Sequence, residues 1–268
     1  MRLVLLLRAA GGWFGAAHFR SVRIAPGKTM RVGASTGVLL SLTLVPSNLL
    51  AQRLHDLTLP TPLPPGATLV IGFLGGFERW DDEHRNVRKL ALKLRQMDGV
   101  YAESISNHHR TVAMKLIRRA LDANRDGVLD PNERASARII VYGQSWGGAA
   151  AIATAWDLDR AGIPVLLTVQ VDSVGPHDDL IPPNVHAAVN FYQHDPFTVQ
   201  GREEITAADP GSTRILGNFA STYLFDSADG PNASWPRRVF GGSHAKMEMD
   251  PELWCQVEHY ICDAIARR

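Results

Sequence analysis

A serine in the segment Gly143-Gln144-Ser145-Trp146-Gly147 is the side chain best placed for covalent chemistry. An apolar run precedes this G-x-S-x-G pattern and small residues follow it, so the motif is expected between a strand and a helix. The glycines permit a turn too tight for a β-carbon, and such a turn presents Ser145 at the strand end. The backbone N–H of Trp146 then points to where a tetrahedral oxyanion would form. The pattern predicts nucleophilic attack by the Ser145 hydroxyl on an acyl group.

Strands and helices are expected to alternate on either side of this turn. One apolar run, at residues 165–171, is nearly continuous, which is typical of a strand covered by helices on both faces. The alternation predicts an α/β fold with a mostly parallel, doubly wound sheet and helices on both faces. The expected strands are Thr68–Phe73, Val100–Ile105, Arg138–Gly143, Val165–Val171, His186–Tyr192 and Arg237–Phe240. The expected helices are Asp82–Met97, Thr111–Leu121, Trp146–Arg160 and Pro251–Ala266.

Three features of the chain resemble the α/β-hydrolase superfamily. They are the turn GQSWGG, a glycine-rich turn after an early strand, and the order of serine, aspartate and histidine along the sequence. The resemblance covers about residues 66–268 and extends to secreted bacterial lipase- and esterase-like serine hydrolases. It implies that a histidine activates the Ser145 hydroxyl and that a carboxylate orients this histidine.

His244 is the histidine that the resemblance singles out. It follows Gly241-Gly242 and lies between the expected last strand and the final helix, where the superfamily keeps its base. His259 is the one histidine further along the chain, and the apolar periodicity around it places it inside the final helix. We therefore expect His244 in a loop, within reach of Ser145.

Two aspartates end strands that follow the serine turn, and each is a candidate for the orienting carboxylate. Asp172 ends the strand at residues 165–171, and Asp195 ends the next one. The superfamily's usual acid follows the later strand, whereas a minority of lipase-like members use the earlier one. Asp172 leaves a rigid apolar strand directly, while Pro196 and a loose loop follow Asp195. We predict Asp172 as the acid and keep Asp195 as the alternative.

The glycine-rich turn GFLGG, at residues 72–76, resembles the oxyanion segment of the superfamily. Ile71 stands where that segment has a histidine. Aligned in this way, the N–H of Phe73 joins the N–H of Trp146 in an oxyanion hole. Because this histidine is missing, the alignment of residues 72–76 with the oxyanion segment can shift by one residue.

A second motif, DANRDGVLDPNE at residues 122–133, matches the EF-hand calcium loop. Calcium takes about seven oxygen ligands, and a glycine at the sixth loop position allows the sharp bend. Val128 offers its backbone carbonyl, and Glu133 closes the shell with two carboxylate oxygens. A single loop predicts a structural calcium ion, and no organic cofactor is expected. The expected ligands are Asp122, Asn124, Asp126, Val128, Asp130 and Glu133.

The first 51 residues differ in charge from the rest of the chain. They hold six basic and no acidic side chains, which leaves 22 basic and 27 acidic side chains elsewhere. Met30-Arg31, an apolar run at 38–45 and small residues after it resemble a secretory signal peptide. We expect 1–51 to be an N-terminal extension with its true start at Met30, and a secreted or periplasmic mature chain from near Gln52. An N-terminal helix, a membrane anchor or an organelle transit peptide are the alternatives.

Charge, hydrophobicity and cysteine spacing exclude several other interpretations of the sequence. A formal net charge of +1 gives no support for a nucleic-acid partner. The apolar run at 38–45 is too short to span a membrane, so the mature chain is expected to have no stable span. Cys255 and Cys262 lie in one expected helix about 10.5 Å apart, which is beyond disulfide reach. Residues 52–268 are expected to form one domain with a lid-like segment at about 196–236.

Together these features predict a serine hydrolase that cleaves carboxylic esters of small molecules or lipids through an acyl-enzyme on Ser145. Among enzymes, a thioesterase or an acyltransferase on the same scaffold is the alternative. Outside enzymes, the alternative is a non-catalytic, calcium-stabilised binding protein, against which the intact serine, histidine and aspartate candidates argue. The acyl and alcohol specificity and the oligomeric state stay open.

Overall fold

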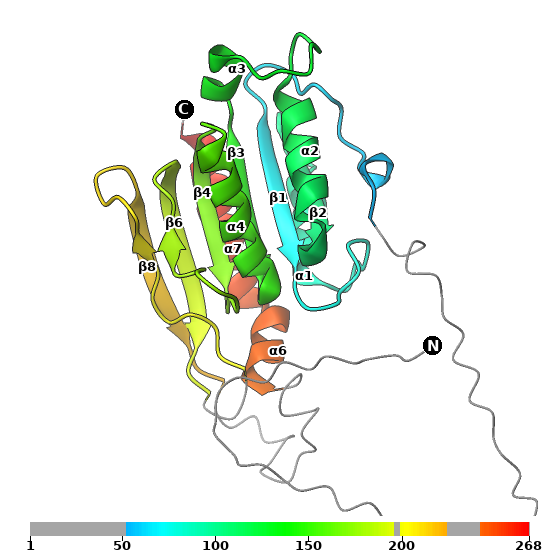
Figure 1. Ribbon diagram of the computed structural model, residues 1–268. Coiled ribbons are helices and arrows are strands. Elements are labelled where there is room, and N and C mark those ends of the chain that lie inside the picture. Colours follow the sequence, from blue (N-terminus) through cyan, green and yellow to red (C-terminus); the bar gives the residue numbers. More distant parts are fainter. Residues whose placement is uncertain (1–51, 196–198, 224–241, 268) are drawn as a thin grey trace, which may run out of the picture. The chain divides into compact units, whose positions relative to one another are not determined.

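Strands and helices alternate along residues 52–195, 199–223 and 242–267, the part of the chain that the computed structural model describes (Figure 1). The strands are β1 (Thr68–Leu74), β2 (Val100–Ser106), β3 (Ile139–Gln144), β4 (Val165–Val171), β5 (Leu180–Ile181), β6 (Val185–Gln193), β7 (Thr206–Ala207) and β8 (Arg214–Ser221). The α-helices are α1 (Asn86–Leu94), α2 (Arg110–Leu121), α3 (Pro131–Ala135), α4 (Trp146–Arg160), α6 (Gly242–Met249) and α7 (Pro251–Ala266). Two 3-10 turns, η2 (Leu54–Asp56) and η3 (Asn107–His109), complete the described elements.

Six of the strands form one sheet in the order β2-β1-β3-β4-β6-β8. Every neighbouring pair in it is parallel. The carboxyl ends of β1, β3, β4 and β6 therefore meet at one edge of the sheet, and the loops after them converge there. The short strands β5 and β7 pair with each other in a separate two-stranded sheet.

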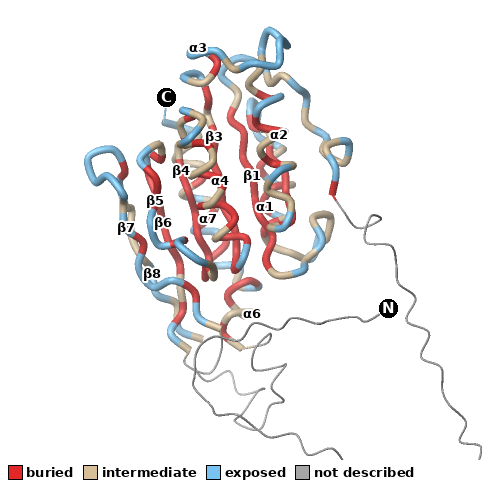
Figure 2. The backbone as a smooth tube through the Cα atoms, in the orientation of Figure 1, coloured by how far each residue is buried: buried red, intermediate tan, exposed pale blue. Residues whose placement is uncertain are grey.

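Helices cover both faces of the large sheet. On one face α2 and α4 pack over inward side chains such as Ile71 and Val141, and on the other α1 and α7 pack over Val70 and Ile140 (Figure 1). Consecutive strand residues point to opposite faces, so each strand contributes to both cores. The central strands are accordingly buried along their length (Figure 2). The expected fold class is confirmed.

The first helix is shorter than the expected Asp82–Met97. It begins at Asn86, because the residues before it form turns. The carboxylate of Asp82 accepts the backbone N–H of His84 at 3.0 Å, and the Asp82 carbonyl accepts the N–H of Arg85 at 3.1 Å. Aspartate that bonds to nearby backbone N–H groups favours turns over helix interiors.

The expected lid-like segment at 196–236 is not irregular throughout, because residues 214–221 form the edge strand β8. This strand is half exposed, so its sequence RILGNFAS lacks both the continuous apolar run of a central strand and a clear alternation. A register shift in the pairing, between Ala188 and Val189 of β6, adds to the irregularity. Edge strands carry a weaker sequence signal because only part of their surface is buried.

The end of the chain differs from expectation at one further point. His244 lies in helix α6 and not in a loop. The expected strand Arg237–Phe240, the N-terminal extension 1–51 and residues 196–198 and 224–236 of the lid-like segment lie outside the described residues. Cys255 and Cys262 are both free, as expected. Within the described ranges, none of the helices has the length and hydrophobicity needed to span a membrane.

Candidate active site

The turn between β3 and α4 holds Ser145 in a strained backbone conformation. Its φ is 55° and its ψ is −127°, which residues with a side chain rarely adopt. A Cβ on Gly143 would lie 2.2 Å from the carbonyl oxygen of Gly147, so only glycine fits there. The Ser145 N–H donates to the carbonyl of Val171 at 2.9 Å, and its carbonyl accepts from Gly148 at 3.0 Å. The surrounding backbone thus fixes the serine at the carboxyl edge of the sheet.

Three side chains from different elements meet at this serine. His244 Nε2 lies 2.9 Å from Ser145 Oγ, and His244 Nδ1 lies 2.6 Å from Asp172 Oδ2. Ser145 precedes α4, Asp172 follows β4, and His244 comes from α6. An ionised carboxylate only accepts hydrogen bonds, so Nδ1–H donates to Asp172 and Nε2 is left to accept the Ser145 hydroxyl proton.

The Asp172 carboxylate is fully buried and held by two further donors. The backbone N–H of Gly201 donates to Oδ1 at 2.8 Å, and the Gln193 amide donates to Oδ2 at 3.1 Å. A Cβ on Gly201 would lie 2.3 Å from the backbone of Asp172, so the close approach requires glycine. With both oxygens occupied, the carboxylate is fixed in the orientation that faces His244.

The alternative acid, Asp195, bonds to the residue that precedes the histidine in α6. Its carboxylate Oδ2 accepts the hydroxyl of Ser243 at 2.7 Å. Ser243 immediately precedes His244 in α6. This bond joins the first turn of α6 to the segment that follows β6.

The two expected oxyanion donors lie in different settings. Trp146 is the first residue of α4, and the N–H groups of a helix's first turn have no partner within the helix. Phe73 is a buried interior residue of β1, opposite Ile105 on one side and Gly143 on the other. The backbone approaches the serine at Gly75, where a Cβ would lie 3.2 Å from Ser145 Cβ. Both donors stay predictions.

A charged network links the loop after β1 to the helix that carries His244. Glu78 accepts the N–H of Gly75 at 3.1 Å and pairs with Arg85 at 3.0 Å. Arg85 also lies 3.7 Å from the Glu248 carboxylate in α6, and the Asn86 side chain donates to the Glu248 carbonyl at 2.6 Å. Burial raises the pKa of Glu78 to about 7, although the charge of Arg85 offsets part of this effect.

An aromatic cluster lies on the surface beside the serine. The ring of His108 stacks on Phe77 with their centroids 5.5 Å apart, and Phe77 meets Trp146 edge-on at 5.4 Å. Phe77 is 83% exposed and Trp146 42% exposed. Exposed aromatic side chains that pack together are typical of a surface that binds an apolar group. No motif in the sequence marks His108, which η3 places in this cluster.

The loop at 122–133 has part of the geometry that a calcium site needs. Gly127 has a φ of 82°, and Asp122 Oδ2 accepts the N–H of Gly127 at 3.0 Å, while Asp122 Oδ1 is buried without a partner. The carboxylate of Glu133, which was expected to give both oxygens to the ion, accepts the N–H groups of Ala123 at 2.8 Å and Asp130 at 3.0 Å. Within the described residues, no group of three or more histidine, cysteine, aspartate or glutamate side chains is gathered to hold a metal ion. The donor types fit calcium, and Glu133 would have to exchange its backbone partners for the ion.

Two residues that donate hydrogen bonds to Asp172, Gln193 and Gly201, were not predicted from the sequence. Gln193 ends β6 and is fully buried, and a buried glutamine at a strand end is a signal that could have been used. Gly201 lies in a segment without periodicity, and no local pattern marks its approach to Asp172. The segments that follow β3, β4 and β6 meet here because these three strands are neighbours in the sheet.

The parallel six-stranded sheet, the helices on both faces and the serine turn between β3 and α4 now define the architecture. The fold is of the α/β-hydrolase type.

Comparisons with known proteins add the following findings. No protein-family model matches the sequence, and no curated protein sequence matches it. Among solved structures, the chain is similar to a cutinase-like protein from Cryptococcus sp., with 11% identity and a TM-score of 0.42 over 78% of this chain and 98% of that one. It is similar to RedJ, a thioesterase of the prodiginine biosynthetic pathway in Streptomyces coelicolor, with 12% identity and a TM-score of 0.40 over 75% and 95%. It is also similar to Est1E from Butyrivibrio proteoclasticus, with 11% identity and a TM-score of 0.37 over 77% and 93%.

The raised pKa of Glu78 predicts a pH-dependent effect of replacing it. The folded state keeps this carboxyl protonated up to about pH 7, so its contribution to stability is complete below its ordinary pKa of 4.5 and is lost as the pH rises through about 7. Glu78→Gln removes the ionisation but keeps an acceptor for Gly75. We expect the variant and the wild type to have similar free energies of unfolding at pH 4.5, and the variant to be more stable by about 2 kcal/mol at pH 8.5.

Urea denaturation at the two pH values measures this difference. Glu83→Gln, an exposed carboxyl five residues further along, is the control and should show no such pH dependence. An equal stability difference at both pH values would contradict the assignment.

Proposed function

We propose that this protein is a serine hydrolase that cleaves carboxylic ester bonds through an acyl-enzyme on Ser145. The observation that carries the proposal is the continuous pair of hydrogen bonds from Ser145 Oγ through His244 to Asp172, 2.9 Å and 2.6 Å long. A serine hydroxyl is a weak nucleophile unless a base accepts its proton, and a strained turn next to a free helix N–H is a costly arrangement without a catalytic use.

In the proposed reaction, Ser145 Oγ attacks the acyl carbon and its proton passes to His244 Nε2. The backbone N–H groups of Trp146 and Phe73 are the proposed donors to the oxyanion that forms. His244 then returns the proton to the leaving alcohol, and the ester bond breaks. Water next attacks the acyl-enzyme with His244 as base, and release of the acid restores the Ser145 hydroxyl. Asp172 holds the imidazole and stabilises its positive charge throughout.

The aromatic cluster of Phe77, His108 and Trp146 supports an ester with an apolar acyl or alcohol group, whether from a small molecule or a lipid. Thioesters share the attacked carbonyl, so a thioesterase or an acyltransferase is the alternative on the same residues. A binding protein without activity is disfavoured because it would not need the strained backbone of Ser145 or the buried carboxylate of Asp172. We also propose that the chain is exported, on the basis of the signal-like sequence before Gln52.

Covalent labelling tests the nucleophile. A fluorophosphonate probe is expected to modify Ser145, and mass spectrometry of the digested protein locates the adduct. Ser145→Ala should lose the label and lower kcat for a 4-nitrophenyl ester by about 10⁵-fold. Ser212→Ala is the control, because this exposed serine bonds to Asp209 outside the site, and the variant should keep both the label and the turnover. Label on another serine, or unchanged turnover in Ser145→Ala, would refute the proposal.

The choice between the two acids has its own test. Asp172→Asn keeps the shape of the side chain but favours the wrong histidine tautomer, so kcat is expected to fall by about 10³- to 10⁴-fold. Asp195→Asn keeps an acceptor for Ser243 and should lower kcat by less than about 10-fold. Steady-state kinetics of both purified variants decides the matter. A severe loss in Asp195→Asn with normal turnover in Asp172→Asn would reverse the assignment.

We also propose that the loop at 122–133 binds one structural calcium ion. The proposed ligands are the side chains of Asp122, Asn124, Asp126, Asp130 and Glu133 and the carbonyl of Val128. The unpartnered, buried Asp122 Oδ1 and the left-handed Gly127 support the proposal. In the calcium-bound state the Glu133 carboxylate would turn from its backbone partners toward the ion. The loop joins α2 to the short helix before β3, so the ion would clamp these elements together.

Chelation tests the calcium proposal. A ligand that binds only the folded state at about 100 times its Kd contributes about 2.7 kcal/mol, so EGTA should lower the Tm of the calcium-loaded protein by about 5–10 °C. Differential scanning calorimetry measures the shift. Glu133→Gln should remove the response to EGTA, whereas Glu204→Gln, an exposed carboxyl outside the loop, should keep it. A Tm that EGTA leaves unchanged in the wild type would count against calcium binding.

A further inference from the structure

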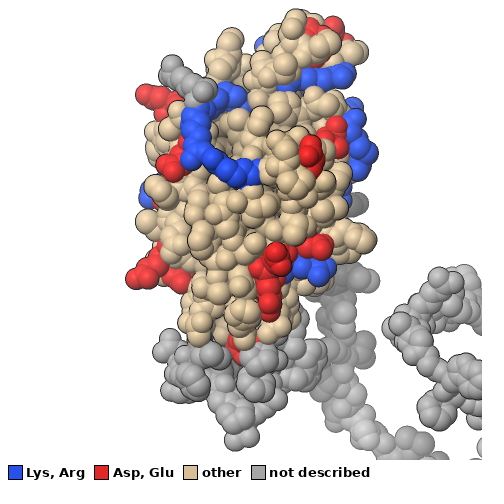
Figure 3. Space-filling model, turned by 90° about the vertical axis from the view of Figure 1, so that its left-hand side faces the viewer, with Lys and Arg blue, Asp and Glu red and all other residues tan. Residues whose placement is uncertain are grey.

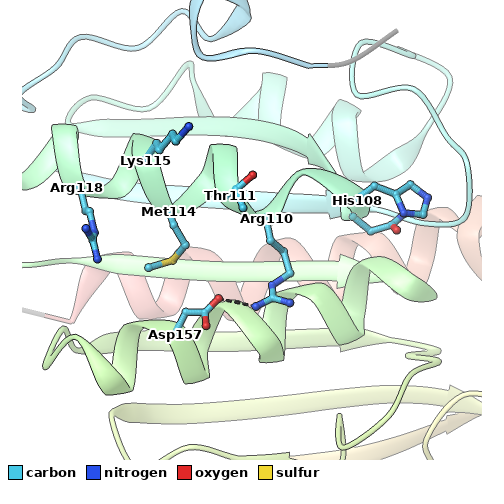
Figure 4. A pocket seen from close by; sticks show the side chains of 8 residues that line it. His108, Arg110, Thr111, Met114, Lys115, Arg118 and Asp157 are labelled. Carbon is cyan, nitrogen blue, oxygen red and sulfur yellow. Dashed lines mark hydrogen bonds and ion pairs between the residues drawn. The ribbon is translucent and has the colours of Figure 1, made fainter. Parts of the chain in front are cut away.

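A groove with a volume of about 490 Å³ lies between α2 and α4 (Figure 4). The side chains of Met114 and Arg118 extend from α2 toward α4, and Arg110 pairs with Asp157 of α4 across the groove (Figure 4). Met114 and the aliphatic stems of the arginines give the groove an apolar lining below its charged groups.

One end of the groove reaches the proposed active site. Asn107 and His108, which line that end, belong to the turn η3. The Asn107 amide donates to the carbonyls of Leu74 and Gly76 in the loop after β1, at 2.9 and 2.6 Å. The His108 ring lies 6.1 Å from the ring of Trp146, the residue next to the nucleophile. A group attached to the reacting ester can therefore pass over His108 into the groove.

The other end of the groove carries uncompensated positive charge. Arg118 has no hydrogen-bond or ion-pair partner for its side chain among the described residues, and neither does Lys115 on the outer side of α2. Arg110 is paired with Asp157, and so is Arg160. An unpaired guanidinium at the end of an apolar groove is suited to bind a carboxylate or a phosphate.

A second hollow of about 390 Å³ continues beyond Arg118 and increases this charge. Arg118 lines both hollows, and the second adds Arg119, Arg134 and Arg160 against the single acidic side chain of Asp122. Residues 52–268 as a whole hold 22 basic and 27 acidic side chains, so this face is positive on a body of net negative charge. A local positive field of this kind attracts anions. On the side of the molecule at β8, a run of basic side chains lies above a broad uncharged surface (Figure 3).

We propose that the substrate carries an extended apolar chain that ends in an anionic group, with the chain in the groove between α2 and α4 and the anion at Arg118. This inference rests on the proposed ester hydrolysis at Ser145 and adds the chemical class of the substrate. At a rise of 1.5 Å per residue, Arg118 lies about 12 Å along α2 from Arg110, the second residue after His108, and this sets the minimum length of chain required. The anion is a carboxylate or a phosphate, on either the acyl or the alcohol side of the ester.

Matched esters test the substrate class. In one arm, 4-nitrophenyl monoesters of octanedioic, dodecanedioic and hexadecanedioic acid are compared with the corresponding neutral methyl diesters. In the other arm, acetate esters of long ω-phosphorylated alcohols are compared with acetates of the unphosphorylated alcohols. We expect kcat/KM to favour the anionic member by about 10-fold in at least one arm, at the chain length that spans the groove. Arg118→Gln should abolish this preference, and Arg214→Gln, an exposed arginine on β8, should retain it.

A binding measurement separates this inference from the proposed function. Calorimetry with Ser145→Ala and the monomethyl ester of dodecanedioic acid, or the phosphorylated alcohol, requires no turnover. We expect Arg118→Gln in the same background to weaken binding of the matching anion by about 10-fold. Ester turnover without an anionic preference in either arm, or a preference that Arg118→Gln retains, would overturn the inference and leave the hydrolase standing. Binding that depends on Arg118 without any turnover would support the groove and refute the hydrolase.

Discussion

The left-handed backbone of Ser145 is the constraint on which the rest of the site depends. A φ of 55° is unfavourable for a serine, and packing around the turn must supply the free energy that maintains it. The glycines that flank the turn remove the β-carbons that would collide there, and the parallel strands on either side hold its backbone through hydrogen bonds. The serine is thereby carried on the most deeply buried strands of the molecule, although its hydroxyl lies at their edge.

The same sheet that fixes the serine also fixes the acid. Asp172 follows the strand next to β3, and its backbone is left-handed as well, with a φ of 44°. Its carboxylate accepts hydrogen bonds from a glycine N–H and a glutamine amide in addition to the histidine ring. Buried carboxylates need such partners because desolvation of an unpaired charge is costly. The two residues with strained backbone at the centre of the site are thus the two that the sheet positions directly.

Whether an element of this fold can be predicted from the sequence depends on how its burial and backbone geometry restrict its residue types. Central strands such as Val165–Val171 are buried on both faces, so their composition alone identifies them. The serine turn can be recognised from a short motif because its backbone leaves no room for a β-carbon at the glycine positions. The edge strand β8 lacks such a signal, since its half-exposed residues satisfy neither pattern. The start of α1 was misplaced because Asp82 forms turns that compete with the helix.

The side chains that contact His244 come from distant parts of the sequence, so no local sequence pattern predicts these contacts. Asp172 and Asp195 both follow strands, and the sequence favours Asp172 only through the rigid strand before it and the Pro196 that follows Asp195. Only the order of strands in the sheet places one against the imidazole and the other against Ser243. Gly201 could not be assigned for the same reason, whereas the position of Gln193 at the end of a strand was a usable signal. The helical position of His244 was missed because Gly241-Gly242 suggests a loop, whereas the helix begins at Gly242 itself.

His244 lies on the short helix α6, so the proposed catalytic contacts can be lost while the sheet stays folded. This helix has eight residues, and Glu248 anchors it through Arg85 and Asn86, while Ser243 anchors its first turn to Asp195. Short elements with few anchors open more readily than central strands. Local detachment of α6 would therefore withdraw His244, the proposed base, while Ser145 and Asp172 kept their native backbone. Under the proposed function, inactivation and global unfolding are then distinct events, and the contacts of Glu248 with Arg85 and Asn86 set the free-energy difference between them.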